Sequence, residues 1–128
     1  MSYDYIIDSS VWVEYFSGSE KGKKSKEIID QKKIATSIIC IAELADKFTR
    51  EERPFHNHLL FIQSKSAILP LSVPITILAA KVKLEQRKKK PKFGLADALQ
   101  FATAREIGAT LITGDSDFSN LSGVLLLR

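Results

Sequence analysis

The fold is decided by residues 94–118, which read GLADALQFATAREIGATLITGDSDF. After Gly94, apolar side chains recur at helical spacing, and Gly108 is the residue type that ends a helix in the left-handed conformation. Residues 109–113 are apolar and β-branched, which predicts a strand that Gly114 breaks. A helix that leads through one glycine into an apolar strand is typical of an α/β sheet. The apolar helix positions are Leu95, Ala98, Leu99, Ala102 and Ile107.

The rest of the chain repeats this alternation of strand and helix. Short apolar runs predict strands at residues 5–7, 34–36, 67–71 and 124–127. A first helix is expected to end at Gly18, and either Ser9 or Ser10 can cap its start. Further helices are expected over residues 23–31 and 37–49 and from Pro54 through Ile62. Another helix is expected to start at Pro74 and to continue into a basic run that stops at Pro91. Residues 124–127 are apolar throughout, as expected of a strand buried on both faces. The pattern predicts an α/β fold of three layers, α/β/α, with a mostly parallel central sheet.

Composition bounds the class of protein. A chain of 128 residues that is 45% hydrophobic is expected to form one domain over residues 1–128, with a core large enough to need no disulfide or structural metal. Cys40 is the single cysteine, so it forms no internal disulfide and, with His56 and His58, no Cys/His zinc site. No apolar run approaches the roughly 20 residues of a membrane span, and the first residues do not resemble a signal peptide. We therefore expect a soluble, cytoplasmic protein without a membrane partner.

The positive charge is concentrated in one stretch. Residues 81–92 hold seven Lys or Arg and one acid, a local charge of +6, whereas the whole chain carries +4. A solvated helix end accounts for such a run, but contact with a phosphate backbone accounts for it equally well. The residues proposed for RNA contact are Arg87, Lys88, Lys89, Lys90 and Lys92.

Four acids fall where a ligand site is expected. Asp8 and Asp115 follow predicted strands, and ligands of open parallel sheets bind beyond the carboxyl ends of the strands. Each could also serve only as a cap or a turn residue. Glu43 and Asp97 lie among apolar neighbours, where an unpaired carboxylate is costly and requires a compensating cation.

A divalent metal would supply that charge. A set of carboxylate oxygens suits Mg²⁺ or Mn²⁺ better than Zn²⁺. Such ions activate water and stabilise charge on phosphoryl oxygens. Together with a basic patch, the acids point to phosphodiester hydrolysis.

Three segments resemble the PIN-domain family, and within it the VapC-type toxins of toxin–antitoxin pairs. DSSVWVEYF at residues 8–16 is similar to the family's first motif, and AELADKFTR at 42–50 is similar to the second. Residues 94–118 resemble the third and fourth motifs in one piece, so the similarity runs from end to end of the chain.

The resemblance implies a function and a set of site residues. The family's metal-binding, catalytic acids match Asp8, Glu43, Asp97 and Asp115. An acid of the last loop, which assists or caps the turn to Phe118, matches Asp117. Small hydroxyl residues that border the pocket match Thr113 and Ser9. The activity implied is Mg²⁺- or Mn²⁺-dependent cleavage of RNA. The resemblance further implies a homodimer and a VapB-type antitoxin whose tail covers the acidic pocket.

Two other functions are compatible with parts of the sequence. The first is phosphotransfer through an aspartyl-phosphate, which also needs an Asp after the first strand. Dehalogenase-type phosphatases need a second Asp two residues later, where this chain has Ser10. Receiver domains need an Asp at the end of the third strand, where this chain reads ILPLS at residues 68–72. A non-catalytic PIN-like module that binds RNA or protein is the other alternative, although all four expected acids are present.

Overall fold

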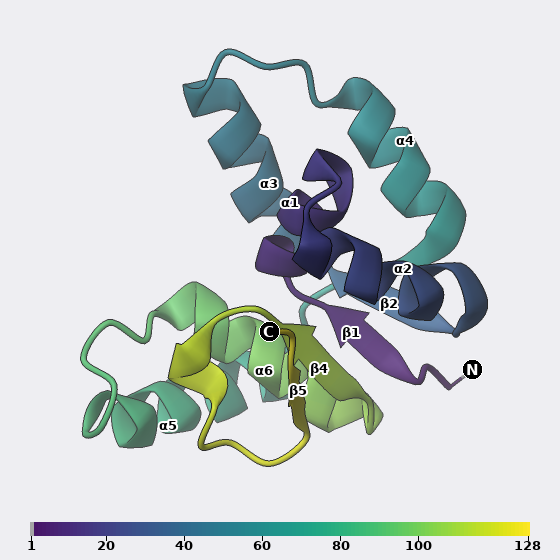
Figure 1. Cartoon of the computed structure of the whole chain (residues 1–128). Helices are drawn as coiled ribbons and strands as arrows, with labels where there is room; N and C mark the ends of the chain where they lie inside the picture. Colours follow the sequence, from purple (N-terminus) through teal and green to yellow (C-terminus); the bar gives the residue numbers. More distant parts are fainter. Residues whose placement is uncertain (1) are drawn as a thin grey trace.

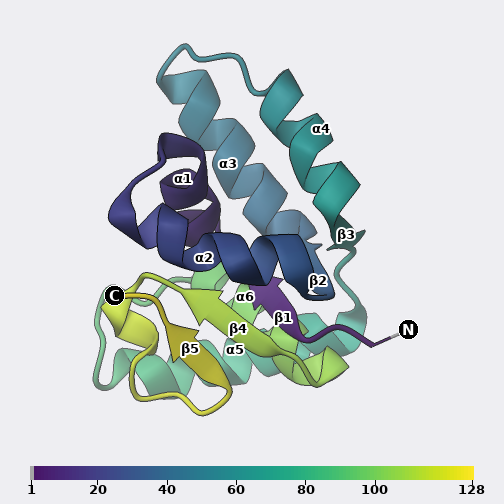
Figure 2. The same ribbon diagram turned by 45° about the vertical axis from the view of Figure 1, so that its right-hand side comes forward.

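The computed structural model describes residues 2–128, in which five strands form one sheet. Every neighbouring pair is parallel, and the strand order is β3-β2-β1-β4-β5. Figure 1 labels β2, β1, β4 and β5, and Figure 2 also labels β3. The strands are β1 (Tyr5–Ile7), β2 (Ile34–Ser37), β3 (Ser66–Leu69), β4 (Thr110–Thr113) and β5 (Val124–Leu126). None of the helices in this part of the chain has the length and apolar character needed to cross a membrane.

Helices cover both faces of the sheet, which confirms the three-layer α/β/α prediction. Helices α1 to α4 lie on one face and α5 and α6 on the other (Figure 2). The helices are α1 (Ser9–Ser17), α2 (Glu20–Gln31), α3 (Ile38–Arg50), α4 (His56–Lys65), α5 (Val73–Arg87) and α6 (Leu95–Ile107), with a short 3₁₀ helix, η1 (Ser116–Phe118).

Successive strand residues feed two separate hydrophobic cores. Ile6 and Leu111 pack against α5 and α6, whereas their neighbours Ile7 and Ile112 pack against α1 to α4. This follows from the period-two alternation of side chains along a strand. The central strands are therefore apolar at consecutive positions because both of their faces are covered.

Two sequence predictions need correction. The first helix is capped by Asp8, whose carboxylate accepts a hydrogen bond from Ser9 N, so Ser9 and Ser10 are helical residues rather than caps. The last strand is not buried on both faces: β5 pairs only with β4 at the edge of the sheet, and Leu125 is 41% exposed. Its apolar composition did not distinguish an edge strand from a central one.

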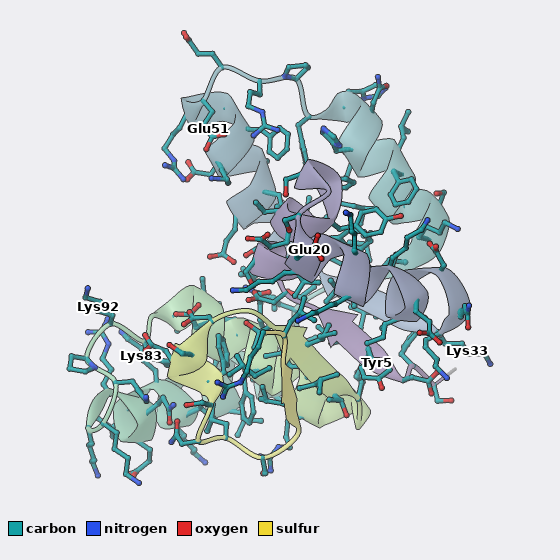
Figure 3. The ribbon with its side chains drawn as sticks, viewed as in Figure 1. Tyr5, Glu20, Lys33, Glu51, Lys83 and Lys92 are labelled. Atoms are coloured by element: carbon teal, nitrogen blue, oxygen red, sulfur yellow. The ribbon has the colours of Figure 1, made fainter. Side chains whose placement is uncertain are left out.

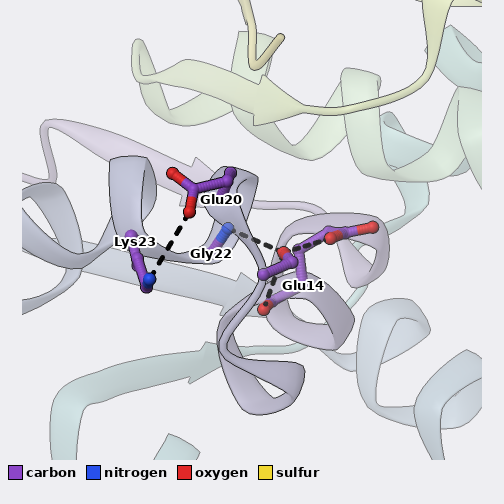
Figure 4. Close-up of polar contacts among 5 residues, drawn as sticks. Glu14, Glu20, Gly22 and Lys23 are labelled. Carbon is purple, nitrogen blue, oxygen red and sulfur yellow. Dashed lines mark hydrogen bonds and ion pairs between the residues drawn. The ribbon is translucent and has the colours of Figure 1, made fainter.

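A close corner between α1 and α2 fixes where α1 lies. Ser19 donates to the carboxylate of Glu14 and accepts from Gly22 N at 3.0 Å (Figure 4). A Cβ atom on Gly22 would lie only 2.1 Å from the carbonyl oxygen of Glu14, so a residue without a side chain is required there. The corner therefore holds α1 and α2 in close contact.

The strand order indicates where a ligand site is expected. From β1 the chain proceeds to β2 and β3 on one side, and then crosses to β4 and β5 on the other. In open parallel sheets the crevice lies where the order reverses, outside the carboxyl ends of the strands. Here that point lies between β1 and β4, the strands that precede Asp8 and Asp115.

Candidate active site

Asp8 is the buried centre of the site. It follows β1 directly, caps α1 and is only 4% exposed. Its Oδ1 accepts from Ser9 N at 2.8 Å, and its Oδ2 accepts from Ser10 Oγ at 2.8 Å and from Thr113 Oγ1 at 2.6 Å. The side chain is thus held by groups from α1 and from the end of β4.

Burial raises the pKa of Asp8 above its ordinary value of 3.8. The hydrogen bonds from Thr113, Ser10 and Ser9 act in the opposite direction, because they favour the charged form, and the nearby charge of Asp115 raises the pKa further. The Asp8 carboxylate therefore accepts several hydrogen bonds but forms no ion pair with a basic side chain among the described residues.

Glu43 approaches Asp8 from the second turn of α3. Its Oε1 accepts from Ser9 Oγ at 3.1 Å and from Gln100 Nε2 at 2.6 Å. Burial raises the pKa of Glu43 above its ordinary value of 4.5, and repulsion from Asp8 and Asp97 adds to the effect. Ser9 lies between the two acids, since its hydroxyl also stands 3.5 Å from Asp8 Oδ1.

Asp97 joins the site from the first turn of α6. Its Oδ2 accepts from Gly94 N at 2.9 Å and so caps the start of the helix. Burial raises its pKa above the ordinary 3.8, and the charges of Asp115, Asp8 and Asp117 raise it further. Helix capping and repulsion from three other acids thus act on the same carboxylate.

The loop after β4 supplies the remaining acids. Asp115 caps η1 by accepting from Asp117 N at 2.9 Å, and its own N–H donates to Thr113 Oγ1 at 3.1 Å. Thr113 therefore bonds both Asp8 and the backbone of Asp115. Asp117 lies in η1 immediately before Phe118, and its charge acts on Asp97. The fold thus brings the acids predicted from the sequence into one electrostatically coupled group.

Among residues 2–128, none of the candidate acids forms an ion pair with a basic side chain. The ion pairs among the described residues lie elsewhere. Lys47, one helical turn after Glu43, pairs instead with Glu51 at 2.7 Å. Acids left without a cation repel one another and are stabilised by an added positive ion.

The donor set fits a hard divalent cation by chemistry. Asp8, Glu43, Asp97 and Asp115 offer only carboxylate oxygens, the ligands that Mg²⁺ and Mn²⁺ prefer. Within residues 2–128, no three His, Cys, Asp or Glu side chains stand close enough to form a ready ligand set.

Two polar residues of the site were missed from the sequence. Ser10 donates to Asp8 and accepts from Gly114 N at 3.0 Å, which ties α1 to the end of β4. Gln100 is fully buried, and its Oε1 has no hydrogen-bond partner, which costs about 1–3 kcal/mol. A lone amide within the apolar run ALQFA at 98–102 was the signal that could have revealed it.

The basic stretch lies beside the acid-bearing loop. Gln86 of α5 donates to Asp117 O at 2.8 Å and to Asn120 Oδ1 at 2.6 Å. The ring of Phe93, which follows Lys92, packs edge-on against Phe118 with centroids 5.2 Å apart. Figure 3 shows Lys83 at the end of α5 and Lys92 in the loop that leads to α6.

Within the stretch the side chains differ. Arg87 donates to Phe93 O at 2.7 Å and braces the loop. Lys88 forms an exposed ion pair with Glu85, while Lys89 and Lys92 are exposed and Lys90 is half-buried. At least three lysines are thus placed at the surface of the loop that precedes Asp97.

A surface cavity of about 390 Å³ opens between α1 and α3. Its wall includes Ser9, Ser10 and Glu43 from the site, and Lys47 and Arg50 from the exposed end of α3. Of the four candidate acids, Glu43 lines this cavity, whereas Asp8, Asp97 and Asp115 do not.

Cys40 lies in the core near the acids and is inert. It is fully buried, and burial with the charges of Asp8 and Glu43 raises the pKa of its thiol well above the ordinary 9.0. It acts as the small apolar core residue predicted from the sequence.

Comparison with known proteins identifies the family. The family model of the PIN domain matches residues 5–124. The chain belongs to the PIN domain family, which excludes the phosphatase and receiver alternatives. No curated protein sequence matches it significantly.

Solved structures share the same fold. A toxin–antitoxin complex from Klebsiella pneumoniae aligns with a TM-score of 0.79 at 23% identity, over 98% of each chain. VapBC2 from Rickettsia felis, bound to a DNA fragment from its promoter, aligns at 0.74 and 21% identity, over 95% of this chain and 96% of that one. A VapC toxin of Mycobacterium tuberculosis described as cleaving the sarcin–ricin loop aligns at 0.70 and 17% identity, over 93% and 95%. At such identities the likeness establishes the fold.

We expect the variant Glu43→Gln to raise the melting temperature of the metal-free protein at pH 7. Because the folded pKa of Glu43 lies above its unfolded value, ionisation removes stability as the pH rises from the unfolded pKa through the folded one. Glutamine keeps an oxygen for Ser9 and Gln100 but carries no charge.

The gain should shrink toward zero below pH 4.5, where Glu43 is protonated in both states. Thermal melts of both proteins from pH 3.5 to 8 measure this. Glu27→Gln, which removes an exposed acid from α2, serves as the control. A difference between Glu43→Gln and the wild type that did not change with pH would contradict the assignment.

Proposed function

We propose that this protein is a divalent-metal-dependent endoribonuclease that hydrolyses phosphodiester bonds in RNA, acting in the cytoplasm as the toxin of a VapBC-type toxin–antitoxin pair. The observation that carries the proposal is the group of coupled acids without a cation at the switch point of the sheet. Burying several carboxylates without a cation lowers the stability of the folded protein. A function that requires these carboxylates explains why the chain contains them.

Asp8, Glu43, Asp97 and Asp115 would hold the ion, Mg²⁺ or Mn²⁺. When bound, such an ion supplies an activated water and stabilises charge on a phosphoryl oxygen. Thr113, Ser10 and Ser9 N fix the Asp8 carboxylate, and Ser9 Oγ also bonds Glu43. Asp117 holds the turn after Asp115 and adds negative charge beside Asp97.

The basic loop would hold the RNA. Lys88, Lys89, Lys90 and Lys92 belong to the segment that enters α6, and Arg87 braces that segment. The packing of Phe93 on Phe118 and the bonds of Gln86 connect this loop to the acid-bearing loop. Phosphates bound by the lysines would lie beside the acids that carry out the cleavage.

A VapB-type antitoxin is the proposed protein partner. The Klebsiella pneumoniae neighbour is a toxin–antitoxin complex, and the Rickettsia felis neighbour is a VapBC assembly. A partner tail that covers the acidic pocket with a basic side chain would neutralise the same charge that the ion neutralises. Such binding would exclude the metal and the substrate together.

The proposed oligomer is a homodimer through α5. Val73, Ile77 and Leu84 recur on one helix face at spacings of four and seven, and Val73 and Ile77 are 71% and 53% exposed. Leu95 at the start of α6 is also exposed. An uncharged apolar face at the start of α5 can pair with itself across a twofold axis.

Asp8→Asn and Asp97→Asn should each lower RNA cleavage in Mg²⁺ or Mn²⁺ by roughly a hundredfold or more, since even residues that contact metal ligands contribute 10- to 100-fold. Cleavage of structured and unstructured RNA by the purified protein, with EDTA as the metal-free arm, measures this. Asp30→Asn should cut like the wild type. Cleavage by either site variant at the wild-type rate would favour the non-catalytic alternative.

Replacing Lys88, Lys89 and Lys90 by Gln should weaken RNA binding and flatten its salt dependence by roughly 0.7 log unit for each lost phosphate contact. The matched control replaces Lys32, Lys33 and Lys65, three exposed lysines at the amino ends of β2 and β3. Binding isotherms of the Asp8→Asn protein between 50 and 300 mM salt compare the two sets. An unchanged slope in the first set would make the basic run a solvated helix end.

Ile77→Glu should convert the dimer to a monomer, because it buries a charge at the centre of the paired apolar faces. The molar mass from light scattering coupled to gel filtration should fall from two chains to one. Leu60→Glu, at an equally exposed apolar residue on α4, is the control and should leave the mass unchanged. A wild-type protein that is monomeric at high concentration would refute the interface.

A further inference from the structure

Gln100 is an unusual residue for its position. It lies in the middle of α6, is fully buried, and is flanked in sequence by the buried apolar residues Leu99 and Phe101. Its Oε1 is buried without a hydrogen-bond partner among the described residues. An apolar side chain of the same size would fill this place without leaving an unpaired acceptor.

The nitrogen of the same amide bonds a candidate metal ligand. Gln100 Nε2 donates to Glu43 Oε1 at 2.6 Å, a short bond to an ionisable acceptor and therefore one of the stronger kind. This bond joins α6 to α3, helices that cover opposite faces of the sheet. The two layers are thus connected beyond the carboxyl edge of the sheet by the side chain of one candidate metal ligand.

The bond also selects which oxygen of Glu43 is available. Ser9 Oγ and Gln100 Nε2 both donate to Oε1. No donor among residues 2–128 bonds Oε2, so that atom is left for a ligand outside the chain. Groups that contact metal ligands commonly fix their orientation in this manner.

We propose that Gln100 is a positioning residue that holds Glu43 with one carboxylate oxygen turned toward the divalent ion. This inference rests on the proposed metal-dependent function. The inference explains why Gln100 Oε1 is buried without a partner among the described residues: the site needs the Nε2 donor of the same amide, although an apolar residue would pack better there.

The test compares Gln100→Met with Thr103→Val in the full-length protein. Methionine keeps the length of the side chain and removes both polar atoms. Thr103 is a buried polar residue one turn further along α6, and its hydroxyl bonds Leu99 O rather than an acid. Calorimetric titration with Mn²⁺ gives the metal affinity, and thermal melting of the metal-free protein gives the stability.

Gln100→Met should bind Mn²⁺ roughly 10- to 100-fold more weakly, while its melting temperature stays at or above that of the wild type. Thr103→Val should keep the wild-type affinity. A Gln100→Met affinity within twofold of the wild type would overturn the inference, whatever the melting temperature.

A double variant separates positioning from a general packing defect. On the Glu43→Gln background, Gln100→Met should weaken Mn²⁺ binding no further, because its effect passes through Glu43. An additional loss as large as in the single variant would overturn the inference. A wild-type protein that bound no Mn²⁺ would instead refute the proposed function itself.

Discussion

The site depends on one tertiary contact, the hydrogen bonding between the ends of β1 and β4. Asp8 accepts from Thr113 at 2.6 Å, and Ser10 links Asp8 to Gly114 N. These bonds lie at the point where the strand order reverses, so they hold the carboxyl ends of β1 and β4 together at the candidate site. Because Asp8 also caps α1, the start of that helix and the geometry of the site are fixed together.

Negative charge is concentrated here at the expense of stability. Burial and mutual repulsion raise the pKa values of Asp8, Glu43 and Asp97, and the hydrogen bonds only partly oppose the effect. Two cores on opposite faces of the sheet supply the compensating free energy of folding. Sites that are less stable than their surroundings are a common consequence of selection for function. In the proposed function, the metal ion and the antitoxin are attracted to the negative charge of the acids. The RNA is attracted to the basic loop beside them.

Much of the architecture was predictable because it is encoded locally. Period-two and period-3.6 patterns gave the strands and helices, and Gly18 and Gly108 end α1 and α6 in the left-handed conformation as expected. The candidate acids could be named from the sequence because they follow predicted strands or stand among apolar residues. Ser10 and Gln100 were not, since a serine in a first turn and a glutamine in a helix are ordinary until their partners are known. The edge position of β5 was missed for the same reason, because an apolar strand does not reveal how many neighbours it has.

The sequence by itself determined the α/β class, the order of elements and the candidate acids, because hydrophobic periodicity and turn residues act over a few neighbouring positions. Only the tertiary structure decided that β1 lies between β2 and β4, that Asp8 rather than a serine caps α1, and that Glu43 bonds Gln100 from the opposite layer. These features join residues as far as 105 positions apart. Such pairings depend on how the helices and strands pack in space, and no local pattern carries that information.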